Sequence, residues 1–66
     1  MSFQELDVVR LTTDLPEDGL AAGAIGTVVH IFRTPSTAYE VEFVDGDGET
    51  LAMTTLAENV LEPFAP

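Results

Sequence analysis

Few side chains in this sequence could perform chemistry: it has one histidine, no cysteine, and twelve acidic residues against two basic ones. A histidine serves as the base in nucleophilic catalysis only when it orients a neighbouring nucleophile. His30 lies in an apolar run, whereas Ser2 is terminal and Ser36 follows a proline, so neither serine suits that role. The lack of cysteine removes thiolate nucleophiles, disulfides and cysteine-bound metals. We therefore expect a protein that is not an enzyme.

The segment Asp45–Glu49 contains the acidic and glycine residues that calcium loops use. An EF-hand needs glycine at its sixth position and glutamate at its twelfth, but counting from Asp45 these positions hold Thr50 and Leu56. The spacing does not fit, so we expect no metal and no cofactor. The two Asp-Gly pairs instead predict a tight hairpin turn, because glycine tolerates positive φ.

The formal net charge of −10 limits the kinds of partner. Affinity for DNA or RNA comes mainly from Lys and Arg that neutralise phosphates, so two arginines exclude a nucleic-acid interface. The acidic residues form two clusters, which either keep a small domain soluble or attract a protein with a basic surface. The candidate partner-binding residues are Glu17 and Asp18 in one cluster and Asp45, Asp47 and Glu49 in the other.

The chain of 66 residues, 45% of them hydrophobic, predicts one domain over residues 1–66. Nearly every apolar side chain is needed for the core of so small a domain, which leaves few to line a ligand pocket. No apolar run approaches the roughly 18 residues of a membrane span, and no signal-peptide pattern is present. We expect a cytoplasmic protein, either a monomer or a weak homodimer.

The residue pattern predicts five short strands. The clearest lies over 39–43, where Tyr39, Val41 and Phe43 alternate with two glutamates and so face the core. The other strands are expected at 7–13, 26–32, 50–54 and 60–62. A long first loop is expected over 14–23, with a single helical turn as the alternative, and a short helical turn at 56–59.

This order of elements predicts an all-β fold, a small SH3-like barrel of five strands, with a partly open OB-type barrel as the alternative. Closing the sheet also removes most exposed strand edges, which a small all-β domain needs in order to avoid self-association. The expected core consists of Val9, Leu11, Val28, Ile31, Tyr39, Val41, Phe43 and Leu61. Arg10 is expected to neutralise a neighbouring carboxylate.

The segment from Gly23 to Ile31 has the spacing G-x-x-G-x-V-x-x-I and resembles the KOW motif of SH3-like barrels in ribosomal and transcription-elongation proteins. The glycines at 23 and 26 are expected to permit a bend into the strand. Val28 and Ile31 both face the core if a β-bulge absorbs their odd spacing.

A longer match, which consists of Asp7-Val8-Val9-Arg10-Leu11, Gly23-x-x-Gly26-x-Val28, Tyr39-x-Val41-x-Phe43 and Leu61-Glu62-Pro63, resembles the C-terminal barrel of nitrile hydratase β-subunits. Short bacterial single-domain proteins of unknown function share this layout, and the chain is most similar to these. The arginine-bearing segments with which that β-subunit meets its catalytic partner are missing. The resemblance implies a fold and docking on a partner, not hydratase activity.

Together these observations favour a non-enzymatic acidic module that binds a protein with a basic surface. It would be either an accessory subunit of a complex or a neutraliser of the antitoxin or immunity type. The alternative is a module that binds a small ligand or a cation through the long loop and the Asp-Gly hairpin.

Overall fold

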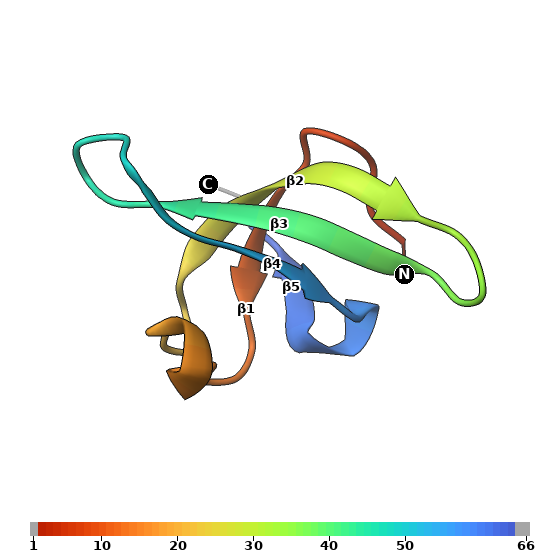
Figure 1. Cartoon of the computed structure of the whole chain (residues 1–66), viewed down its shortest axis with the longest axis horizontal. Helices are drawn as coiled ribbons and strands as arrows, with labels where there is room; N and C mark the ends of the chain where they lie inside the picture. The colour runs from red at the N-terminus through yellow and green to blue at the C-terminus, as the bar shows by residue number, and fades with distance from the viewer. Residues whose placement is uncertain (1, 65–66) are drawn as a thin grey trace.

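The computed structural model describes residues 2–64 as a single antiparallel sheet of five strands with two 3₁₀ turns (Figure 1). Residues 1, 65 and 66 of the predicted domain lie outside the described residues. The strand order is β4-β3-β2-β1-β5. The elements are β1 (Val8–Leu11), η1 (Pro16–Asp18), β2 (Ile25–Phe32), β3 (Ala38–Val44), β4 (Thr50–Leu56), η2 (Glu58–Val60) and β5 (Leu61–Pro63). The all-β prediction is confirmed.

One 3₁₀ turn lies within the predicted first loop and the other begins later than expected. The first loop contains η1, the single helical turn given as the alternative, which starts at Pro16 and is capped by Gly19 with a left-handed φ of 70°. The second turn was expected at 56–59 but begins at Glu58, because Ala57 keeps an extended backbone with ψ of 157°. Both turns contain three residues, so the sheet carries nearly all the regular structure.

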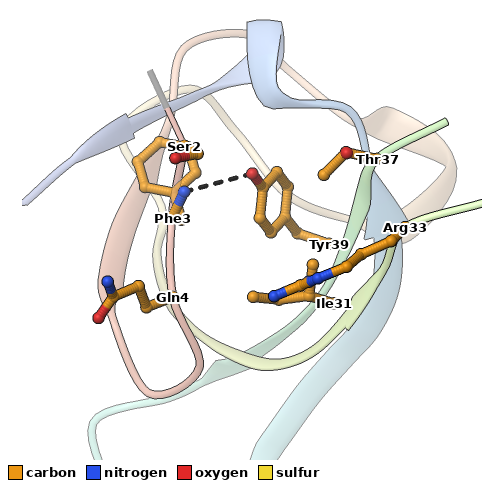
Figure 2. A pocket seen from close by; sticks show the side chains of 7 residues that line it. All are labelled: Ser2, Phe3, Gln4, Ile31, Arg33, Thr37 and Tyr39. Carbon is orange, nitrogen blue, oxygen red and sulfur yellow. Dashed lines mark hydrogen bonds between the residues drawn. The ribbon is translucent and has the colours of Figure 1, made fainter.

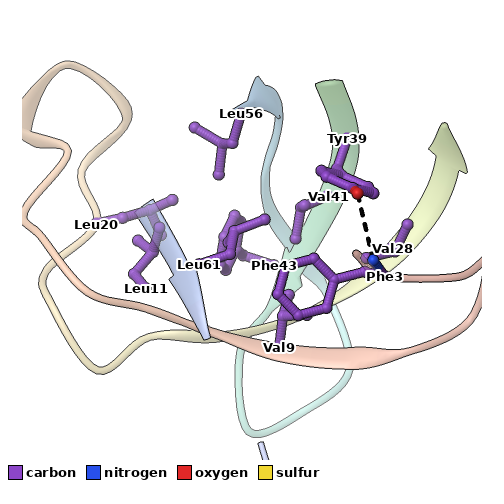
Figure 3. Close-up of a cluster of buried hydrophobic side chains, with 10 residues drawn as sticks. All are labelled: Phe3, Val9, Leu11, Leu20, Val28, Tyr39, Val41, Phe43, Leu56 and Leu61. Carbon is purple, nitrogen blue, oxygen red and sulfur yellow. Dashed lines mark hydrogen bonds between the residues drawn. The ribbon is translucent and has the colours of Figure 1, made fainter. Parts of the chain in front are cut away.

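The core lies on one face of the curved sheet (Figure 3). Its central row is defined by the register, which places Val9 opposite Gly26 and Gly26 opposite Phe43. Seven of the eight predicted core residues are buried, but Ile31 is only partly buried at the edge of the cluster. The buried cluster comprises Phe3, Val9, Leu11, Leu20, Val28, Tyr39, Val41, Phe43, Leu56 and Leu61.

A register shift in the β2–β3 ladder confirms the predicted bulge. Val28 pairs with Val41 and His30 with Glu40, so Val29 is the extra residue on β2. An extra residue reverses the side-chain alternation once. Val28 and Ile31 therefore both face the core side despite being three positions apart.

Gly26 is required for a reason other than the predicted bend. It lies within β2, and its φ is not in the left-handed region, in contrast to Gly23, whose φ is 95°. A Cβ at Gly26 would lie 2.7 Å from Cγ1 of Val41 and 2.9 Å from Cδ1 of Phe43. Glycine is needed here because the neighbouring strand β3 packs against the position where a side chain would be.

The two edge strands approach one another across the core. β4 and β5 are the outer strands of the sheet, and within residues 2–64 no ladder pairs them. Leu56 at the end of β4 and Leu61 at the start of β5 both belong to the buried cluster. The sheet thus curls around one core, with η2 connecting its two edges.

Candidate functional site

The face of the sheet opposite the core carries an exposed apolar surface. Because successive side chains on a strand point to opposite faces, the neighbours of the buried row at Val9, Gly26 and Phe43 lie outside. These neighbours include large apolar side chains that are 43% to 58% exposed. We call this surface the outer patch; it consists of Val8, Ile25, Val44, Leu51 and Met53.

Two glutamates of β3 lie on the same face and are held in place. Glu42 stands between Thr27 and Met53 in the register, and one of its oxygens accepts a 2.7 Å hydrogen bond from the Thr50 hydroxyl. Glu40 accepts a 2.6 Å bond from the Thr55 hydroxyl across the same strand pair. These carboxylates remain partly exposed and keep acceptor positions for Lys or Arg of a partner. The alternation over 39–43 placed both outside, but sequence reasoning did not select them as site residues.

Arg10 does not offset these negative charges, because its own partner is Glu62. Its Nε donates to Oε1 of Glu62 at 2.8 Å, and its guanidinium lies 5.9 Å from the ring centroid of Phe64. The predicted neutralisation of Arg10 by a neighbouring carboxylate is therefore confirmed.

In the predicted acidic hairpin, the Asp45 carboxylate stabilises the turn, and the other two carboxylates are exposed. Oδ1 of Asp45 accepts bonds from the backbone N–H groups of Asp47 at 2.8 Å and Glu49 at 3.0 Å, which fixes the turn. Asp47 and Glu49 are exposed. Because Val44 and Thr50 flank this turn, its two free carboxylates border the outer patch.

The second predicted cluster lies elsewhere. Glu17 and Asp18 are exposed in η1, which Figure 1 shows as a projection separate from the 45–49 hairpin. η1 borders an open cavity of about 300 Å³ lined by residues 14–18. The two acidic clusters thus do not form one site.

The structure also places the residues considered for catalysis and metal binding. His30 is exposed, and its ring packs edge-on against Phe32 with centroids 4.6 Å apart. In the part of the chain that is described, no three His, Cys, Asp or Glu side chains are grouped to hold a metal ion. No helix in residues 2–64 has the length and apolar character needed to cross a bilayer.

A second open cavity, of about 380 Å³, lies where the N-terminal segment crosses the ends of β2 and β3 (Figure 2). Phe3, Ile31 and Tyr39 are its apolar or aromatic lining residues, in keeping with the expectation that few apolar side chains remain to line a pocket. The segment before β1 was not predicted to pack, but Phe3 joins the core and encloses one side of this cavity. The lining residues are Ser2, Phe3, Gln4, Ile31, Arg33, Thr37 and Tyr39.

Comparison with known proteins gives one match. The model of a family described as Domain of unknown function (DUF4926) covers residues 5–63. No curated protein and no solved structure matches the chain. The likeness to nitrile hydratase β-subunits and to the KOW motif stays a prediction.

Proposed function

The chain belongs to the DUF4926 family, a domain of unknown function, and we propose that it is a non-enzymatic cytoplasmic module that binds a basic protein. The outer patch would form the centre of the interface. The carboxylates around the patch would receive the partner's Lys and Arg side chains.

The observation that carries this proposal is the outer patch itself. Apolar side chains that gather on one exposed face are typical of protein interaction sites. The patch draws Val8 from β1, Ile25 from β2 and Met53 from β4 onto one face, although they are far apart in the sequence. A mixed surface of this kind, with an apolar centre and a polar rim, has the composition of a non-obligate interface.

The charge distribution supports a basic partner rather than an acidic one or a second copy. Glu40 and Glu42 lie on the patch face, and Asp47 and Glu49 border it. With a net charge of −10, two copies of the chain would repel each other. A basic surface would be attracted from a distance, which raises the association rate.

Two biological settings fit this surface, an accessory subunit and a neutraliser of a basic enzyme. To separate them, the tagged protein is used to capture partners from its host at low salt, and the captured protein is identified by mass spectrometry. The purified partner is then assayed alone and in the complex. Loss of its activity indicates a neutraliser, whereas unchanged or increased activity indicates an accessory subunit.

The interface is tested with matched substitutions on one strand. Ile25→Thr removes a 44% exposed side chain of the patch, whereas Phe32→Thr removes a 42% exposed side chain at the far end of β2. We expect Ile25→Thr to weaken binding of the captured partner by about tenfold, the size of a loss near 1.4 kcal/mol at an interface centre. Phe32→Thr should leave the dissociation constant unchanged. Equal effects of the two substitutions would contradict the proposed site.

We also propose that the curled sheet is an SH3-like barrel. The support is that the edge strands β4 and β5 contribute Leu56 and Leu61 to one buried cluster and are linked by η2. In solution, methyl cross-peaks between Leu56 and Leu61 in an NMR spectrum would be the sign of the closed arrangement. Their absence would leave an open sheet.

A further inference from the structure

The 380 Å³ cavity is assembled from two parts of the chain that the sequence separates widely. Ile31 and Tyr39 face each other across β2 and β3 and form its floor. Phe3 forms a wall: its backbone N–H donates to the Tyr39 hydroxyl at 3.2 Å, and the two rings meet edge to face at 5.4 Å. The cavity is therefore open to solvent with a lining of mixed polarity, and its volume is within the range of small-ligand sites.

Arg33 supplies the only charged side chain of this cavity lining. The chain has two basic residues, and the other, Arg10, is paired with Glu62. In residues 2–64 no carboxylate pairs with Arg33, although acidic residues outnumber basic ones by twelve to two in the sequence. In Figure 2 the Arg33 side chain lies beside Ile31 and extends across the opening toward Gln4. The exposed Arg33 side chain thus lies next to Ile31 and has no counter-charge from residues 2–64.

We propose that this cavity binds a monocarboxylate that carries an apolar group, with Arg33 holding the carboxylate. The planar guanidinium donates two parallel N–H bonds to a carboxylate, and Ser2 and Thr37 also line the cavity. Phe3, Ile31 and Tyr39 would contact the apolar group. A phosphate dianion fits less well, because a protein with a net charge of −10 repels the second negative charge. This site is separate from the outer patch.

The proposal is tested by titrating the isotope-labelled protein with phenylacetate at low salt and following its amide signals. We expect saturable shifts at Ile31, Arg33 and Tyr39. Arg33→Gln should weaken binding at least about tenfold, as expected for loss of a charge-assisted bidentate contact. Arg33→Lys, which keeps the charge but not the fork, should bind with intermediate affinity.

Arg10→Gln is the matched control, because it removes the same charge from the protein at a site outside the cavity. This variant should bind phenylacetate with an affinity within about twofold of the unsubstituted protein. Thermal melting of each variant establishes that it is folded. Absence of saturable shifts, or equal weakening by Arg33→Gln and Arg10→Gln, would overturn the proposal.

Two kinds of ligand could present this carboxylate to Arg33: a small organic acid and the C-terminus of a peptide. A short acetylated peptide ending in Phe, with a free carboxylate, is therefore compared with phenylacetate and with the amidated peptide. Tighter binding of the free-acid peptide assigns the cavity to a chain terminus, and tighter binding of phenylacetate assigns it to a small acid. Equal affinities for the acid and amide peptides would show that the carboxylate is not recognised. None of these outcomes depends on the outer patch.

Discussion

At the scale of single residues, Gly26 shows how a contact between strands restricts one position. Its missing side chain allows β3 to approach, with the Val41 side chain 2.7 Å and the Glu42 carbonyl oxygen 2.9 Å from where a Cβ would stand. The carbonyl belongs to the backbone of a central strand and cannot move without disturbing the sheet. Protein interiors are packed too densely to absorb such an overlap.

Glycine-to-alanine substitutions at three positions separate this packing effect from backbone strain. Gly26→Ala should lower the free energy of unfolding by about 1–3 kcal/mol, the usual cost of overpacking a core. Gly23→Ala should cost about 1 kcal/mol through its positive φ, since it has open space around it. Gly46→Ala, which meets neither restriction, should change stability by less than about 0.5 kcal/mol. Urea denaturation measures all three, and a Gly26→Ala cost equal to that of Gly46→Ala would refute the packing argument.

At the scale of elements, the N-terminal segment is attached to the sheet at two places. The Leu6 N–H donates to the Val28 carbonyl oxygen on β2 at 2.7 Å. Further toward the N-terminus, the Tyr39 hydroxyl on β3 accepts the backbone N–H of Phe3, whose buried ring packs on the Tyr39 ring. The same contact shapes one wall of the 380 Å³ cavity.

Removing the hydroxyl tests this attachment. Tyr39→Phe keeps the ring and leaves the Phe3 N–H without its partner, so we expect a loss of about 1 kcal/mol in the free energy of unfolding. Hydrogen exchange should become faster at Phe3, while the amides of β3 and β4 should be little affected. Unchanged exchange at Phe3 would show that its amide is not protected by the Tyr39 hydroxyl.

At the scale of the whole molecule, negative charge works against the compact state. The protein carries a net charge of −10, and folding brings its carboxylates closer together than they are in the unfolded chain. Several carboxylates have partners that offset the local cost. Glu62 pairs with Arg10, Glu40 and Glu42 accept threonine hydroxyls, and Asp7, Asp14 and Asp45 accept backbone N–H groups. Most of the remaining acidic side chains are exposed, where salt screens them.

Stability should therefore increase with salt. Raising NaCl from about 50 to 500 mM shortens the Debye length from about 14 to about 4 Å and should raise the urea midpoint at neutral pH. The variant with Glu17→Gln, Asp18→Asn, Asp47→Asn and Glu49→Gln should respond less, because it has four fewer negative charges. Asp45 is kept, since its carboxylate fixes the hairpin. A midpoint that falls with salt, or an equal response of both proteins, would show that repulsion among these residues does not limit stability.

The features that depend on neighbours along the chain could be predicted from the sequence. The alternation over Tyr39–Phe43, the Asp45–Gly48 turn and the bulge near Val29 could all be predicted, because each is a local pattern of side-chain direction or φ. The family match over residues 5–63 agrees with the prediction of a single-domain protein from a family of unknown function. The two acidic clusters were visible as well, but not the use of Asp45 within its own turn.

Which distant residues come to share a surface depends on tertiary packing. The outer patch places Val8 and Met53 on one face of the sheet, and the cavity brings Phe3 to Ile31 and Tyr39. These arrangements of distant residues follow from strand register and from the path of the N-terminal segment across the sheet. Neither produces a periodic pattern in the sequence. The same holds for Gly26, whose neighbours on β3 come from 15 to 17 positions further along the chain. Local patterns fix the strands, whereas the packing of one strand against another fixes the surfaces with which the protein could bind.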